Sequence, residues 1–241
     1  MTHFLRYRYR PEPLREAIES VVGTRPLKEA CCGLVVPAVD VVAGKIWLFK
    51  TDHHPSGQWA TPDILAVDAA MATAAAPTYF PAHTISGVGT FVDGGLWAYS
   101  PTTVALTEAM AYLGYDLDAI RMLSISTTSV PFFLPQARRL GGLIRWAKLL
   151  VDAILRFQVE GSWGVAKSLL TLRGGAYHRI DHVAPQEIFT LDNASMVNDL
   201  IELGRQVGHY QQHYDYFREH FLDGQVATLH RRSKAELRLA P

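Results

Sequence analysis

The sequence contains few cysteines and no long apolar segment. These two features argue against a disulfide-rich protein and against a membrane-spanning one. The two cysteines, Cys31 and Cys32, are adjacent, a spacing that favours neither a disulfide framework nor a zinc site. No run of about 18 apolar residues is present, as a membrane-spanning helix requires, and residues 1–10 lack the apolar core of a signal peptide. We therefore expect a cytoplasmic protein.

Net charge is absent as well, since 23 lysines and arginines balance 23 aspartates and glutamates. This balance gives no support for nucleic acid as a partner. A chain of 241 residues, 49% of them hydrophobic, can bury one sizeable core. We expect one domain over residues 1–222, followed by a polar and basic tail over residues 223–241.

Strand and helix signals alternate along the chain. β-branched residues indicate strands, and alanine-rich or amphipathic segments indicate helices. The strand over 121–126 should be buried on both faces, and the helix over 140–157 has a basic face that lies either in solvent or on an anionic membrane. Strands are expected over 34–42, 45–50, 121–126 and 188–191, and helices over 14–22, 64–75, 102–114, 140–157, 165–172 and 193–222.

The histidines give no strong metal signal. His53 and His54 are neighbours, so they would point in different directions, and we expect a solvent-exposed loop there. His209 and His213 are one turn apart on a predicted helix, but without the glutamate of H-E-x-x-H or a third ligand. His83 is interpreted as a loop residue. We expect no metal and no cofactor.

The segment Phe91–Pro101 joins a short strand, a carboxylate and a tight turn. Its first residues favour a strand, and Gly94 and Gly95 allow backbone angles that are closed to other residues. Asp93 would then lie at the C-terminal end of a strand, where open α/β sheets place their chemistry, and it could accept a proton from a nucleophile. A structural Asp-Gly turn without a catalytic role is the alternative interpretation.

Three blocks resemble the patatin-like phospholipase family in their order and approximate spacing. Asp93-Gly94-Gly95 is similar to the Asp-Gly-Gly/Ala motif of that family. Residues 75–81, Ala-Ala-Pro-Thr-Tyr-Phe-Pro, resemble a segment upstream of the motif, and residues 123–128 resemble the family's Leu-Ser-(Leu/Ile)-Gly-Thr. The resemblance implies an α/β fold with a mostly parallel central sheet flanked by helices.

The same resemblance implies a lipid acyl hydrolase of the phospholipase A type that acts in lipid catabolism through a Ser/Asp dyad. In that family the nucleophile is a serine in a Gly-x-Ser-x-Gly elbow, and a glycine-rich loop forms the oxyanion hole. By resemblance, Asp93 is the base, and Gly94 and Gly95 shape the turn that presents it. The implied partner is a phospholipid or another acyl-ester lipid, with peripheral contact to a membrane.

The nucleophile elbow does not occur among these 241 residues, because Gly161-Ser162-Trp163-Gly164 has the wrong spacing. In the family the elbow precedes the part that this chain resembles. We therefore expect either a C-terminal portion of the patatin-like fold or a degenerate member, inactive by itself. A non-catalytic lipid- or protein-binding module is the alternative, and a separate chain that supplies the elbow is a third hypothesis. Apolar surface left exposed would promote self-association.

Overall fold

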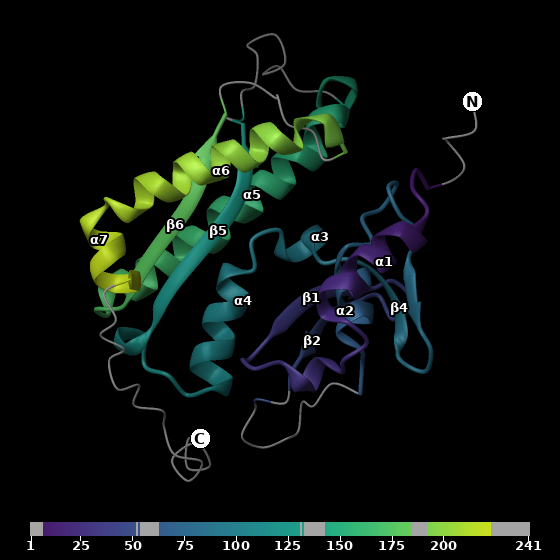
Figure 1. The fold of residues 1–241 in the computed structure, drawn as a ribbon, viewed down its shortest axis with the longest axis horizontal. Helices are drawn as coiled ribbons and strands as arrows, with labels where there is room; N and C mark the ends of the chain where they lie inside the picture. The colour runs from purple at the N-terminus through teal and green to yellow at the C-terminus, as the bar shows by residue number, and fades with distance from the viewer. Residues whose placement is uncertain are drawn as a thin grey trace. The chain divides into compact units, whose positions relative to one another are not determined.

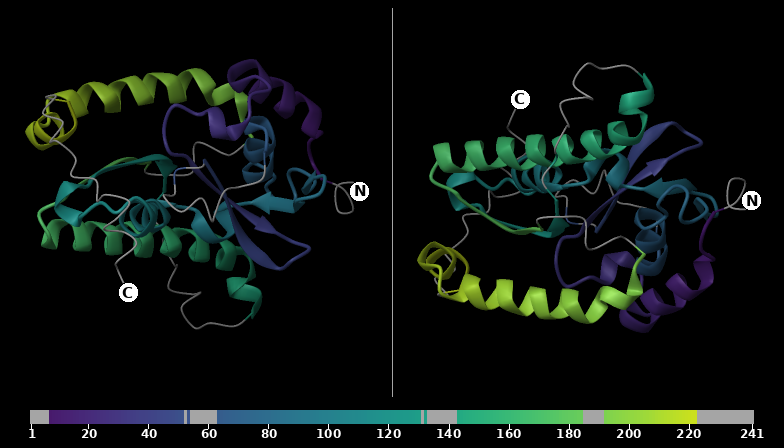
Figure 2. Two further views of the ribbon diagram at one scale, coloured as in Figure 1. Left: turned by 90° about the horizontal axis from the view of Figure 1, so that it is seen from below. Right: turned by 90° about the horizontal axis from the view of Figure 1, so that it is seen from above.

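The computed structural model describes residues 7–51, 53, 63–130, 132, 143–184 and 192–222. The chain forms two compact units (Figure 1, Figure 2). The first unit comprises Met1–Glu108 and Phe157–Ser162, and the second comprises Ala109–Arg156 and Trp163–Pro241. The strand expected over 188–191 and the tail expected over 223–241 lie outside the described residues.

A four-stranded antiparallel sheet organises the first unit. β1 pairs antiparallel with β2 and with β4, and β4 pairs antiparallel with β3. Only a few residues connect β1 to β2 and β3 to β4, and such short connections join antiparallel strands. In this unit the pairing differs from the mostly parallel sheet that we expected. The strands are β1 (Val35–Asp40), β2 (Lys45–Lys50), β3 (His83–Ile85) and β4 (Gly89–Asp93), in the order β2-β1-β4-β3.

Alanine and phenylalanine build the core between this sheet and α2 (Ala66–Thr73). Ala38, Phe49, Ala72 and Phe91 are fully buried, and the two phenylalanine rings meet edge to face with centroids 5.0 Å apart. The small side chains of α2 allow this helix to lie close to β1 and β4, which it contacts. The alanine-rich helix predicted over residues 64–75 is thus confirmed in a shorter form.

Polar side chains tie the helices of the first unit to its strands. On α1 (Pro11–Val22), the guanidinium of Arg15 lies 2.8 Å from Asp68 Oδ1 on α2. The Nε2 atom of His83 lies 3.1 Å from the same oxygen. His83 is therefore a strand residue with a carboxylate partner, which corrects its interpretation as a loop residue.

A buried glutamate makes a second connection. After α3 (Gly95–Ala98) and α4 (Thr102–Thr107), the helix continues as a π-helical segment, η3 (Glu108–Tyr112). Glu108 Oε2 lies 2.7 Å from Lys50 Nζ, and Glu108 Oε1 lies 2.9 Å from His53 Nε2. The side chain of His53 is only 12% exposed, so the expected solvent-exposed loop is wrong at this residue. His54 lies outside the described residues.

The second unit contains a parallel strand pair, β5 (Arg121–Ser129) and β6 (Ala176–Val183). Parallel neighbours require a crossover, and the long helix α5 (Leu143–Leu172) provides it. Figure 2 shows α5 along one face of the pair and α6 (Val197–Gln212) along the other. The remaining elements are η2 (Leu27–Glu29) in the first unit, and η4 (Leu117–Ala119), η6 (Ala194–Met196), α7 (Asp215–Phe217) and η7 (Arg218–Leu222) in the second.

Taken together, these elements confirm a mixed α/β fold, whose strand pairing is partly antiparallel and partly parallel rather than mostly parallel. β6 was not expected from its sequence. The helices expected separately over 140–157 and 165–172 are one helix, α5, which continues through Gly161 and Gly164. Within the described part of the chain, no helix combines the length and hydropathy needed to cross a bilayer.

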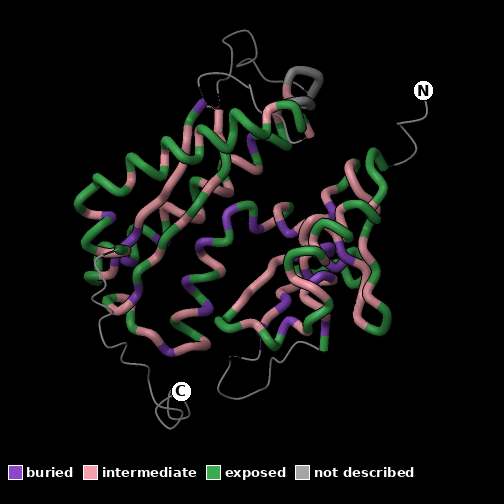
Figure 3. The backbone as a smooth tube through the Cα atoms, in the orientation of Figure 1, coloured by how far each residue is buried: buried purple, intermediate pink, exposed green. Residues whose placement is uncertain are grey.

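The second unit exposes more apolar surface than expected. Alternate residues of β5 face solvent, and Ile125 is 72% exposed. The expectation of a strand buried on both faces is therefore wrong. No residue of α6 is buried, as the colouring of this helix in Figure 3 shows.

Candidate active site around Asp93

The backbone places Asp93 at the last position of β4, as the sequence predicts. On the neighbouring strand β1, Asp93 is paired with Ala38. The N–H of Asp93 donates to the carbonyl oxygen of Ala75 over 3.1 Å. Ala75 opens the first of the three motif blocks, so the structure brings two of those blocks together. The third block, residues 123–128, lies on β5 in the second unit.

Gly94 is required by a close approach of two backbone segments. A Cβ atom at this position would lie 2.2 Å from the carbonyl oxygen of Pro37, which no relaxation of a flexible side chain can relieve. The backbone φ of Gly94 is −64°, an ordinary helical value. The expectation that this glycine supplies unusual backbone angles is therefore wrong, because the requirement is steric.

Gly95 holds the carboxylate of Asp93 in place. Its N–H donates to Asp93 Oδ1 over 2.7 Å, and a Cβ atom at Gly95 would lie 3.0 Å from the same oxygen. The helix α3 begins at this glycine, and Trp97 Nε1 donates to the carbonyl oxygen of Ala38 over 3.0 Å. The turn is thus fixed at both ends by hydrogen bonds to the sheet and to the carboxylate.

Burial raises the pKa of the Asp93 carboxyl above its ordinary value, and the hydrogen bond from the Gly95 N–H offsets part of that rise. Among the described residues, this N–H is the one group that donates to the carboxylate, and no cation pairs with it. Asp93 Oδ2 is therefore left as an acceptor. A half-buried carboxylate with a raised pKa and a free oxygen is well suited to take up a proton.

Ser162 belongs to the Gly-Ser-Trp-Gly segment of α5, and its hydroxyl is fully used in hydrogen bonds. Its Oγ donates to the carbonyl oxygen of Ser100 over 2.8 Å and accepts from the N–H of Thr103 over 3.2 Å. These bonds attach the Phe157–Ser162 segment to the start of α4. Ser162 is therefore a structural serine in this arrangement, in agreement with its unsuitable motif spacing.

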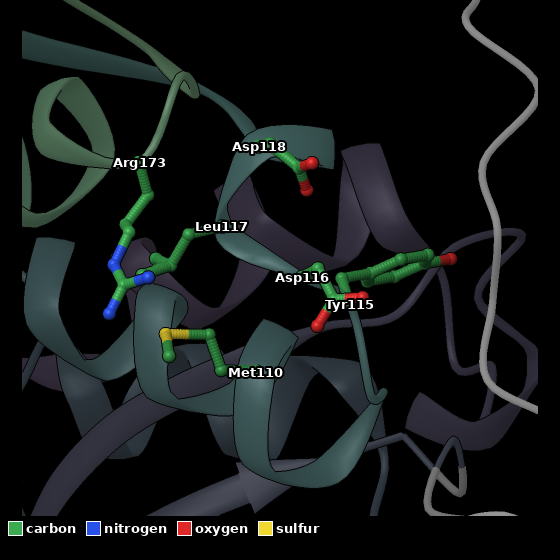
Figure 4. A pocket seen from close by; sticks show the side chains of 6 residues that line it. All are labelled: Met110, Tyr115, Asp116, Leu117, Asp118 and Arg173. Atoms are coloured by element: carbon green, nitrogen blue, oxygen red, sulfur yellow. The ribbon is translucent and has the colours of Figure 1, made fainter.

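A hollow of about 290 Å³ in the first unit contains Trp97 and Ser162 in its lining. A hollow of about 430 Å³ lies in the second unit (Figure 4). Its charged residues Asp116, Asp118 and Arg173 are exposed, and none of the predicted site residues lines it. Among the described residues there is no group of three or more histidines, cysteines or carboxylates that could hold a metal ion.

Comparison with known proteins agrees with the motif blocks. Residues 2–106 match the family described as patatin-like phospholipase, and this match contains Asp93 and its turn. Longer alignments with curated proteins extend the similarity over most of the chain. These matches confirm the resemblance to patatin-like phospholipases that the motif blocks indicate.

Among its relatives is a cGAMP-activated phospholipase of Escherichia coli, 31% identical over 226 residues, which are 84% of this chain and 62% of that protein. A cGAMP-activated phospholipase of Vibrio cholerae is 30% identical over 218 residues, 83% of this chain and 61% of that protein. Patatin-like protein 1 of Oryza sativa subsp. indica is 30% identical over 117 residues, 45% of this chain and 28% of that protein. The chain thus spans less than two thirds of the length of each of these curated relatives.

Proposed function

We propose that Asp93 is the general base of a Ser/Asp dyad in a lipid acyl hydrolase of the phospholipase A type. The observation that supports this role is its environment: a half-buried carboxylate with a raised pKa, one oxygen held by the Gly95 N–H and no cationic partner among the described residues. A higher pKa makes a carboxylate a stronger proton acceptor toward a hydroxyl group. Gly94 and Gly95 would serve this role by fixing the turn.

In the proposed mechanism, a serine hydroxyl gives its proton to Asp93 Oδ2 while its oxygen attacks the carbonyl carbon of the lipid ester. Asp93 returns the proton to the departing alcohol, which leaves an acyl-serine ester. A water molecule then gives a proton to Asp93 as it attacks this ester, and the fatty acid is released when the serine oxygen takes that proton back. The Gly95 N–H keeps Oδ1 in place throughout.

The serine of that mechanism is not found in a Gly-x-Ser-x-Gly segment of these 241 residues. We therefore propose that the 241-residue chain, tested by itself, hydrolyses no ester above background. A fluorophosphonate probe attaches to activated serines, so it should label none of the serines of this chain. Covalent labelling at any of them, mapped by mass spectrometry, would contradict this part of the proposal.

The role of Asp93 is tested in a hybrid that joins a family member's elbow segment to this chain. Asp93→Asn should lower kcat by about 10²–10⁴, the usual contribution of a general base, with a smaller effect on KM. Asp63→Asn is the matched control, because Asp63 forms an exposed ion pair with Lys28. If Asp93→Asn retained full activity, the carboxylate would not be the base.

The non-catalytic lipid- or protein-binding module is the second candidate, and the same variants separate it from the first. A binding module should retain its affinity for phospholipid vesicles when Asp93 is replaced, and no hybrid should hydrolyse lipid.

Vesicle co-sedimentation of the unmodified chain also tests the proposed peripheral contact with membranes. Self-association through exposed apolar surface is tested by analytical ultracentrifugation. We also propose a cytoplasmic location, which cell fractionation would check.

A regulator is suggested by the names of the bacterial relatives, which are cGAMP-activated phospholipases. We propose that the hydrolase activity of this protein is likewise controlled by a cyclic dinucleotide. Hydrolysis of phospholipid vesicles by the active hybrid should increase when cGAMP is added. An unchanged rate at saturating cGAMP would restrict that regulation to the relatives.

A further inference from the structure

The long helix α5 exposes apolar side chains along the side that faces away from its own strands. Trp163 stacks on Tyr177 of β6, and Ala166 and Leu170 on the same side of α5 are fully buried. On the opposite side, each position at helical spacing is exposed, and none of these positions carries a charge. We call them the α5 stripe: Leu150, Ile154, Phe157, Gly161, Val165, Ser168 and Leu172.

The α5 stripe is a continuous surface, because all of its positions lie on one helix. From Leu150 to Leu172 it extends over about 33 Å, at 1.5 Å per residue. Its large side chains are between 47% and 79% exposed. The side chains of α5 that bond to α3 and to the start of α4, Gln158 and Ser162, lie beside the stripe and not within it. A solvated helix face is normally polar, so this one is suited to a partner.

Gly161 lies in the middle of the stripe, and the packing of the chain does not require a glycine there. A Cβ atom at this position would meet no heavy atom within 4 Å. Glycine inside a helix makes the helix less stable than alanine does, so nothing in the described part of the chain accounts for this residue. A second backbone that approaches α5 closely at this point would account for it.

The stripe has the same spacing in both directions from Gly161. Its other positions lie four, seven and eleven residues before the glycine and four, seven and eleven residues after it. In two antiparallel copies of α5 related by a two-fold axis at Gly161, Phe157 faces Val165 of the second copy, and Leu150 faces Leu172. A two-fold axis requires this kind of self-complementary surface.

The area of the stripe is adequate for such a pair. Together with the flanking Val151 and Leu169, its exposed side chains present roughly 500–700 Å² per copy, so two copies would remove about 1,000–1,400 Å² from water. Specific interfaces begin at about 1,200 Å². Ser168 adds no unsatisfied group to this surface, since its hydroxyl donates to the carbonyl oxygen of Gly164 over 2.8 Å.

We propose that the α5 stripe binds a second copy of this chain, as an antiparallel pair of α5 helices that cross at Gly161. The inference rests on the self-association proposed above and names the surface that carries it. Side chains of each helix pack between those of the other, and the glycine permits a close approach. A membrane surface would require neither the symmetric spacing nor the central glycine. The small area predicts a dissociation constant in the micromolar range.

Sedimentation velocity of the 241-residue chain between about 2 and 200 μM tests the association. The chain should change from monomer to dimer over this range. Val165→Glu places a charge within the stripe and should weaken the dimer by at least about tenfold. Lys167→Glu is the matched control, because it places the same residue on the same helix outside the stripe and should change the dissociation constant by less than about twofold.

Cysteine cross-linking tests the direction and register of the two helices. Phe157→Cys and Val165→Cys are made in a chain that carries Cys31→Ser and Cys32→Ser, and disulfides are formed with oxidised glutathione. A mixture of the two variants should give a covalent dimer. Either variant alone should not, because in the antiparallel pair the two copies of one position lie about 12 Å apart along the helices, beyond the reach of a disulfide.

A monomer at all concentrations would overturn the proposal, as would equal association of Val165→Glu and the original chain or cross-linking of one variant alone. If Val165→Glu does not fold by circular dichroism, the cross-linking experiment decides. Association that persists in Val165→Glu would keep self-association and remove this surface. A monomeric chain whose binding to phosphatidylglycerol vesicles is lost in Val165→Glu would assign the stripe to membranes. Hydrolysis by the hybrid tests Asp93 separately.

Discussion

The strands of the two units differ in how much of their surface the rest of each unit covers. In the first unit, β2 and β4 contribute Phe49 and Phe91, both completely buried under α2. In the second unit, β5 leaves Ile125 72% exposed, and no residue of α6 is buried. Strand residues of similar hydrophobicity therefore differ widely in how much of their surface is buried. The candidate base Asp93 belongs to the first unit, whose strands contribute buried core residues, so its position is supported by that core.

The largest expected effect comes from truncating one apolar side chain in each unit. Phe91→Ala should lower the free energy of unfolding by about 3–5 kcal/mol, because it leaves a cavity among fully buried neighbours. Ile125→Ala should cost less than about 0.5 kcal/mol, as expected for an exposed residue. Urea denaturation followed by fluorescence measures both. Similar costs for the two variants would show that β5 is covered in solution.

A smaller effect is expected from the buried ion pair. Glu108→Gln leaves Lys50 and His53 without their shared carboxylate, and breaking a buried pair in this way should cost about 3 kcal/mol. The matched variant in the second unit is Asp152→Asn, which removes the exposed pair with Arg156 and should cost about 0.3–0.5 kcal/mol. Equal losses in thermal denaturation would contradict the difference in burial between the Glu108 and Asp152 ion pairs.

The next effect concerns the turn itself. Gly94→Ala brings a methyl group against the Pro37 carbonyl and should destabilise the first unit by about 1–3 kcal/mol, the usual cost of overpacking. Gly161→Ala, in the middle of α5, should be neutral or stabilising, because alanine favours a helix by about 1 kcal/mol relative to glycine. Chemical denaturation of both variants gives the comparison. A neutral Gly94→Ala would mean that the turn can move away from β1.

The smallest effect is a dependence on pH. Because the folded chain raises the pKa of Asp93, it binds more protons than the unfolded chain between the two pKa values. The free energy of unfolding should therefore fall as the pH rises through that interval, just above the ordinary titration range of a carboxyl group. Asp93→Asn should abolish this decline and be slightly more stable than the original chain at neutral pH. Lower stability of the variant at neutral pH would contradict the raised pKa.

The sequence predicts best those features that depend on neighbouring residues, such as strand bounds and turns. Lys45–Lys50 is a strand with the expected bounds, and Asp93 ends a strand, because β-branched and aromatic residues followed by two glycines leave few alternatives. The pairing of β4 with β1 depends on contacts between distant segments, which is why the sequence does not predict it. The continuity of α5 was missed for a related reason: tertiary contacts override the low helix propensity of Gly161 and Gly164.

Within the candidate site, the sequence identifies the turn but not its environment. The motif residues Asp93, Gly94 and Gly95 are contiguous and therefore visible in the sequence. The close approach of Gly94 to the Pro37 carbonyl joins segments that are distant in the sequence, and nothing in the immediate neighbours of either residue indicates it.

Pro37 explains where β4 leaves the sheet. Every second N–H along an antiparallel strand faces the same partner strand, and the N–H of Val41, directly after β1, donates to the carbonyl oxygen of Thr90. By this alternation the nitrogen of Pro37 faces β4, but proline has no hydrogen to donate. Pairing between the two strands accordingly begins at Ala38, opposite Asp93. Two features of the sequence therefore fix the location of the carboxylate: its own turn and the distant Pro37. An evolutionary change at either position would require an accommodating change at the other.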